Sequence, residues 1–117
     1  MDEQIFKQRT KQLALGIVRL VEALPRRRAA DVIGKQLLRS ATSVGANYRA
    51  ACRGKSVADV IAKLALVEEE ADESIYWLEL LVESDILPLE RLKDLMKETN
   101  EILAMTVASI KTLRARL

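Results

Sequence analysis

The chain has 117 residues, half of them hydrophobic but only four aromatic, and a net charge of +2. This length predicts a single domain with one core, spanning residues 1–117. With no His and a single Cys, the sequence excludes Ser-His and Cys-His nucleophile pairs, an intramolecular disulfide and a structural zinc site.

The scarcity of turn-forming residues favours long helices. Two Pro and four Gly leave room for few connections, and four helices of more than twenty residues fill the length. Long helices joined by short loops are typical of a bundle. We therefore predict an all-α fold, an antiparallel up-down-up-down four-helix bundle.

The first helix is expected over about residues 2–23, where Pro25 stops it. Its apolar side chains share one narrow arc: Phe6, Thr10, Leu13, Ile17, Leu20 and Leu24. The corner that follows contains Arg26, Arg27 and Arg28. These three guanidinium groups either bind phosphate or form a solvated corner that suits the negative end of the helix dipole.

The second helix, over about residues 30–53, divides into three lengthwise stripes. The apolar stripe contains Ile33, Leu37, Ala41, Val44, Tyr48 and Ala51. The basic stripe, on the opposite side, contains Lys35, Arg39, Arg49 and Arg53, and short polar groups follow one flank at Gln36, Ser40, Ser43 and Asn47. Gly54 is expected to end this helix in a left-handed conformation.

The third helix is expected over about residues 57–83, begun by a Ser56–Asp59 capping box. Its predicted core stripe is Val57, Val60, Leu64, Val67, Ala71, Ile75, Leu78 and Val82. A second apolar stripe lies almost opposite: Ala62, Leu66, Trp77 and Leu80. One four-helix bundle cannot bury both stripes, so the second predicts an oligomer interface.

Glu68 falls within the core stripe of the third helix. The antiparallel register of the corner between the second and third helices places it opposite Ser40, Ser43 and Asn47, which would be its hydrogen-bond donors. We predict a buried polar network of these four residues, with Arg39 able to supply charge. In the alternative, the third helix is slightly rotated and Glu68 reaches solvent.

Pro88 marks the start of a fourth helix, which runs to about Arg114. Charge divides between the halves of the chain: residues 1–55 contain twelve Lys or Arg against four Asp or Glu, and residues 56–117 contain seven against thirteen. This asymmetry indicates either an anionic partner or helices that neutralise each other inside the bundle.

The two central helices resemble a known family. The segments RSATSVGANYRAACRGKS and KLALVEEEADESIYWLELL are similar to the bacterial four-helix bundle proteins found in intervening sequences of large-subunit ribosomal RNA genes. A related branch contains the accessory variability proteins of diversity-generating retroelements. Many relatives have S-I-P-S-N-I-A-E-G where this chain has residues 43–51, so the acidic residue of that motif is missing here. The resemblance implies a homopentameric ring, and a nucleic acid or a reverse transcriptase as partner.

Two functional classes remain open. No Walker or dinucleotide-binding glycine motif is present. The only conceivable metal ligands are the carboxylates of residues 68–73, where Glu69 and Glu73 are one turn apart, but such residues more commonly form a solvated or ion-paired face. We therefore expect no enzyme, cofactor, metal or small-molecule substrate. The first class is an oligomeric scaffold that binds RNA or duplex phosphates through the corner and the basic stripe. The second is a structural or protein-interaction bundle, such as a reverse-transcriptase accessory protein, that binds no nucleic acid itself. We favour the first.

Without a signal peptide or a membrane-spanning segment, a cytoplasmic protein is expected.

Overall fold

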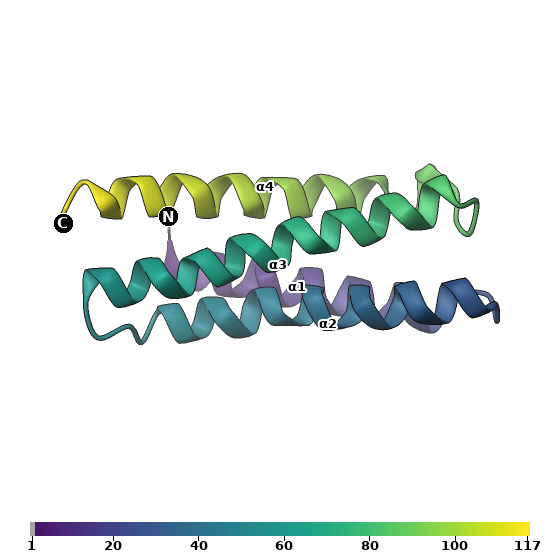
Figure 1. The fold of residues 1–117 in the computed structure, drawn as a ribbon, viewed down its shortest axis with the longest axis horizontal. Helices are drawn as coiled ribbons and strands as arrows, with labels where there is room; N and C mark the ends of the chain where they lie inside the picture. Colours follow the sequence, from purple (N-terminus) through teal and green to yellow (C-terminus); the bar gives the residue numbers. More distant parts are fainter. Residues whose placement is uncertain (1) are drawn as a thin grey trace.

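The computed structural model describes residues 2–117 and shows four helices. They are α1 (Glu3–Glu22), α2 (Arg28–Ala51), α3 (Val57–Glu83) and α4 (Leu89–Arg114). The helices lie side by side in a rod of 48 × 20 × 19 Å (Figure 1). Contacts are extensive between helices consecutive in sequence, and a smaller contact between α1 and α4 closes the bundle. The predicted all-α fold of four packed helices is confirmed.

Side chains cap two of the helix starts. Asp2 accepts a hydrogen bond from the backbone N–H of Ile5 at 3.0 Å at the start of α1. At α3, Ser56 Oγ accepts from the N–H of Asp59 at 3.0 Å, and the Asp59 carboxylate accepts from the N–H of Lys55 at 2.9 Å. The predicted pairing of Ser56 with Asp59 is therefore confirmed, and it satisfies N–H groups that have no partner within the helix.

Gly54 has a different role from the one predicted. No glycine among residues 2–117 has a positive φ, so the left-handed cap expected there is wrong. A Cβ atom at Gly54 would lie 2.3 Å from Cγ2 of Val60 and 3.1 Å from the carbonyl oxygen of Ala51. Glycine is needed at this corner because the end of α2 and the start of α3 approach each other closely, not because of backbone strain. The positive φ in the described chain belongs to Asp85, at 59°.

The buried face of α3 is rotated from the predicted one. Val60, Ile75 and Val82 are only half-buried. The buried residues are Ile61, Leu64, Val67, Ala71, Ser74, Leu78 and Leu81, which from Leu64 onward alternate steps of three and four. Helices that stay in contact over many turns follow a repeat of about 3.5 residues, whereas a straight helix has 3.6 residues per turn and drifts from that contact line.

This rotation also corrects the prediction for Glu68. Its side chain is half-buried, and no hydrogen bond joins it to Ser40, Ser43 or Asn47. Ser43 and Asn47 donate to backbone carbonyls of their own helix. Ser40 is fully buried, and its hydroxyl meets that of Ser74 on α3 at 2.8 Å. The buried polar link between α2 and α3 is thus a neutral serine pair, and a buried carboxylate is not part of it.

Candidate nucleic-acid interface

Six of the seven predicted nucleic-acid contacts are exposed cations without an acidic partner. Arg26 and Arg27 lie in the corner between α1 and α2, and Arg28 begins α2. Lys35, Arg49 and Arg53 follow on the exposed side of α2 and beyond its end. Among residues 2–117, none of these six forms an ion pair. Their charges remain available to an anion from solution.

Arg39 is the exception, because α3 neutralises it. Its guanidinium pairs with Glu70 at 3.2 Å and with Glu73, and Glu73 also accepts a hydrogen bond from Trp77 Nε1 at 3.2 Å. Of the two interpretations of the charge asymmetry, mutual neutralisation therefore applies at this position. The basic stripe is split into a part that joins α2 to α3 and a part that faces solvent.

A groove between α1 and α2 gathers further cations. The two helices come close where Gly45 faces Thr10: a Cβ at Gly45 would lie 3.2 Å from Thr10 Oγ1. The groove has a volume of about 490 Å³, and its polar lining comprises Gln4, Lys7, Gln8, Thr10, Lys11, Thr42 and Arg49. Three of these side chains are cationic, and their hydrogen-bonding groups are mainly donors, which suits an anion.

Two residues of this groove were absent from the sequence prediction. Lys7 and Lys11 are one turn apart on α1, and the groove brings both beside Arg49. Lys7 pairs with Glu3 at 3.4 Å, whereas Lys11 forms no ion pair among the described residues. The spacing of four residues was visible in the sequence. The approach of the two lysines to Arg49 depends on how α1 packs on α2, and a wheel drawn for one helix gives no information on that packing.

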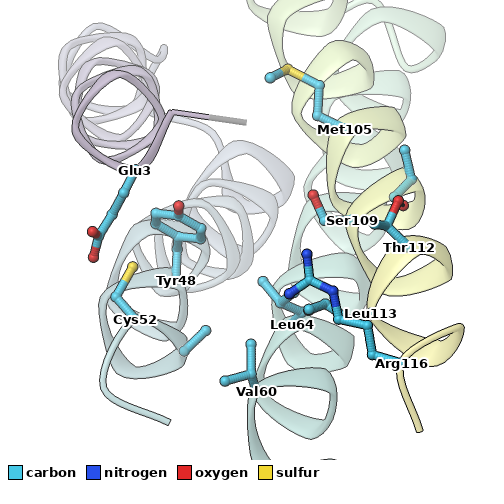
Figure 2. A pocket seen from close by; sticks show the side chains of 12 residues that line it. Glu3, Tyr48, Cys52, Val60, Leu64, Met105, Ser109, Thr112, Leu113 and Arg116 are labelled. Carbon is cyan, nitrogen blue, oxygen red and sulfur yellow. Dashed lines mark hydrogen bonds between the residues drawn. The ribbon is translucent and has the colours of Figure 1, made fainter. Parts of the chain in front are cut away.

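A larger hollow lies at the end of the bundle where α1 begins (Figure 2). It has a volume of about 700 Å³. Glu3, Tyr48 and Cys52 line one side, and Arg116 lies with Ser109 and Thr112 of α4 on the other. The apolar wall between them includes Val60 and Leu64 of α3.

The titratable groups of this hollow do not form an activated nucleophile. Burial raises the pKa of the Cys52 thiol and the pKa of the Tyr48 hydroxyl, so both remain protonated near pH 7. The Cys52 thiol and then Lys7 lower the pKa of Glu3, which stays ionised. No group of three His, Cys, Asp or Glu side chains suited to a metal ion occurs in the described part of the chain.

Comparison with known proteins settles the family. The family model of the 23S rRNA-intervening sequence protein matches residues 2–108. The chain belongs to this family. A similar solved structure is that of a protein of unknown function from the S23 ribosomal protein family of Bacteroides thetaiotaomicron, at 36% identity and a TM-score of 0.87. The alignment covers 95% of this chain and 99% of that one. No curated protein matches.

The family match divides the two hollows. The groove between α1 and α2 lies wholly within the matched residues 2–108. The hollow at the bundle end takes one wall from Ser109 and the residues after it, which lie outside the matched segment.

The predicted oligomer interface lies on the outer side of α3. Leu66 is 45% exposed and Ala62 is exposed, while Trp77 and Leu80 are half-buried. Tyr76, which the sequence prediction omitted, is 53% exposed and packs edge-to-face on Trp77 with ring centroids 5.1 Å apart. These side chains leave apolar and aromatic surface open to a partner. None of the four helices is long and apolar enough to cross a membrane, over the residues that the structure describes.

Proposed function

We propose that this protein is a non-enzymatic, oligomeric helical scaffold that binds structured nucleic acid through the exposed cations of α1 and α2. The observation that supports the proposal most directly is the set of unpaired cations on this side, Arg49 and Arg53 above all, beside a donor-lined groove. Lys and Arg side chains on phosphates give affinity without base recognition. The ribosomal RNA context in the name of the family agrees with such a ligand.

The test is a charge reversal with a matched control. Arg49→Glu with Arg53→Glu should weaken binding to RNA hairpins and to duplex DNA equally, by about tenfold or more at low salt, because phosphate contacts carry no sequence information. Arg91→Glu with Lys97→Glu makes the same change of net charge on exposed positions of α4 and should have much less effect. A wild-type protein that binds neither RNA nor DNA at low salt would refute the proposal.

A protein-interaction role is the second candidate, favoured by the pairing of Arg39 with Glu70 and Glu73. That pairing shows how basic and acidic helices can satisfy one another without a ligand. Under this alternative the protein binds a partner such as a reverse transcriptase and has no affinity of its own for nucleic acid. The same binding experiment separates the two functions.

The oligomeric part of the proposal is a homopentamer assembled through the outer side of α3. The exposed fractions of Leu66 and Tyr76 support it, and a ring would repeat the basic surface and raise avidity for a polyanion. Leu66→Glu should convert the assembly to monomers that remain helical. Leu89→Glu, at another exposed Leu (51%), serves as the control. Sedimentation equilibrium that detects only a 13.1 kDa species for the wild type would refute assembly.

A further inference from the structure

The unpaired cations of α2 recur along one side of the helix. Arg28, Lys35 and Arg49 are separated by multiples of seven residues, which is close to two helical turns, so they share a side of α2. All three are exposed, and Arg53 continues the same side past the end of the helix. Between Lys35 and Arg49, this side presents Arg39, which Glu70 and Glu73 neutralise, and the uncharged Thr42 and Ala46. The unpaired cations are therefore concentrated at the two ends of α2, with Lys35 alone between them and no unpaired cation from Lys35 to Arg49.

We define these groups by their residues. The corner cluster comprises Arg26, Arg27 and Arg28, and the distal cluster comprises Lys11, Arg49 and Arg53. The step from Arg28 to Arg49 is 21 residues along α2, which corresponds to about 32 Å at 1.5 Å per residue. One turn of B-form DNA repeats after about 34–36 Å. A duplex lying parallel to α2 would thus present equivalent phosphates to both clusters.

A single strand fits this surface poorly. Single-strand platforms stack bases on aromatic rings. Here Phe6 and Tyr48 are buried in the core against each other, and Tyr76 and Trp77 belong to α3.

A duplex needs no aromatic platform. Each of its two strands approaches a flat surface once per turn and curves away in between, so one strand can contact the two ends of α2 at successive turns. The duplex is also stiff over this distance, so that contact at one cluster directs the next turn to the other. We propose that the ligand of this surface is a double-helical nucleic acid, held along α2 by the phosphates of two successive turns at the corner and distal clusters. This inference rests on the proposed function and specifies the form of its ligand.

Duplex length gives the first test. The full-length protein is titrated with duplexes of about 8 and about 16 base pairs, shorter and longer than the 10–10.5 base pairs of one turn, and with a single strand of the longer length, each as DNA and as RNA. We expect the longer duplex to bind about tenfold more tightly than either other ligand. The DNA and RNA series show which duplex geometry fits the spacing better.

Neutralisation of the duplex backbone gives the second test. It distinguishes contact at two separate turns of the duplex from attraction to the charge of the whole duplex. In the longer duplex, methylphosphonates replace the phosphates either of the central base pairs or of the two ends. We expect the central change to leave affinity within about twofold, and the terminal change to reduce it to that of the short duplex. Equal losses from the two changes would overturn the inference, because they indicate uniform contact along the duplex.

Variants at the corner cluster complete the experiment. Arg26→Ala, Arg27→Ala and Arg28→Ala together should lower the affinity of the longer duplex to that of the shorter one and reduce the slope of log K against log salt by about 0.9 for each lost phosphate contact. The short duplex, held by the distal cluster, should bind almost as before. The helical content of the variant, measured by circular dichroism, confirms folding. Single strands that bind as tightly as duplexes overturn the inference and leave the proposed function intact, whereas absence of all binding overturns both.

Discussion

Arg9 is the residue whose loss should reveal how α1 is held against α4. Its Nε donates to Oε2 of Glu98 at 3.0 Å and its Nη2 to Oε1 at 2.6 Å, a two-pronged contact with one carboxylate. Nη2 also reaches Glu101 at 3.0 Å, and Nη1 reaches the sulfur of Met105 at 3.2 Å. The hydrogen bond with Glu98 is the main reason that the pKa of Arg9 is raised above its ordinary value.

The expected magnitude follows from exposure and geometry. Side-chain exposure is 28% for Arg9 and 31% for Glu98, between a solvated pair, which contributes about 0.2–1 kcal/mol, and a buried charged hydrogen bond, which contributes about 1.5–3 kcal/mol. We expect Arg9→Met, which keeps an unbranched apolar stem, to lower the free energy of unfolding by about 1–2 kcal/mol. The melting temperature should fall by roughly 4–8 °C.

The assay is urea unfolding of the wild type, Arg9→Met, Glu98→Gln and the double variant, at low salt and at about 1 M salt. At the higher concentration, salt ions screen charges from one another beyond about 3 Å. The coupling energy between the two positions should be positive at low salt and smaller at high salt. Lys93→Met removes a more exposed pair with Glu90 and should cost less than about 0.5 kcal/mol. The reasoning would be refuted if Arg9→Met were no less stable than Lys93→Met, or if the coupling energy were the same at both salt concentrations.

Three further predictions concern the core and the α2–α3 corner. Gly54→Ala should cost about 1–3 kcal/mol in urea unfolding, because its methyl would collide with Val60; an unchanged midpoint would contradict this. Ser40→Ala should lower the free energy of unfolding by about 1 kcal/mol. Ser74→Ala should cost less when it is added to Ser40→Ala than when it is made in the wild type, because across the two helices each hydroxyl contacts only the other; strictly additive losses would argue against the pair. Because burial raises the pKa of Cys52 in the folded chain, its contribution to stability is complete below the unfolded thiol pKa of about 8.5 and is lost as pH rises through the folded value. Cys52→Ala should flatten the decline in stability between about pH 8 and 10, and parallel curves for the two proteins would contradict that assignment.

Helix positions were predictable from the sequence because their signals are local. Pro25 and Pro88 interrupt the helical pattern, and Ser56 with Asp59 marks a helix start, so these boundaries need no knowledge of neighbours. The hydrophobic arc of α1 was equally direct: Phe6 and Leu20 are both buried as predicted. Local chemistry therefore determined most of the helix boundaries, whereas the end of α2 was predicted from a left-handed Gly54 that the structure does not have.

The face that α3 buries was only partly predictable. Leu64, Val67, Ala71 and Leu78 were placed correctly, but a wheel for an isolated straight helix exchanged Ile75 for Ser74. Packing against α2 and α4 selects the 3.5-residue repeat, and that choice buries a serine in place of an isoleucine. Hydrophobicity alone favours burial of the isoleucine. The hydroxyl of Ser40, which gives the buried Ser74 a hydrogen-bond partner, lies on another helix and is not visible in the pattern of α3.

The candidate binding surface shows the same division. Exposed cations on α2 were predictable from periodicity, and their positions agree with the structure. Which of them remain unpaired was not predictable, because only the packing of α2 on α3 shows that Arg39 meets Glu70 and Glu73 while Arg49 meets no acid. Lys11 was missed for the same reason, since the groove that contains it is made by two helices.

The smaller contact between α1 and α4 has a consequence for how the chain folds. Consecutive helices pack through short corners, whereas the contacts of Arg9 with α4 join residues 89 to 96 positions apart. Their formation must therefore close a loop that contains most of the chain. Such a contact forms after the transition state when local helix pairs can nucleate earlier. We therefore expect Arg9→Met to accelerate unfolding and to leave the refolding rate nearly unchanged in a chevron plot. Closure of the bundle would then govern how long the native state lasts, and the α2–α3 hairpin how fast it is reached.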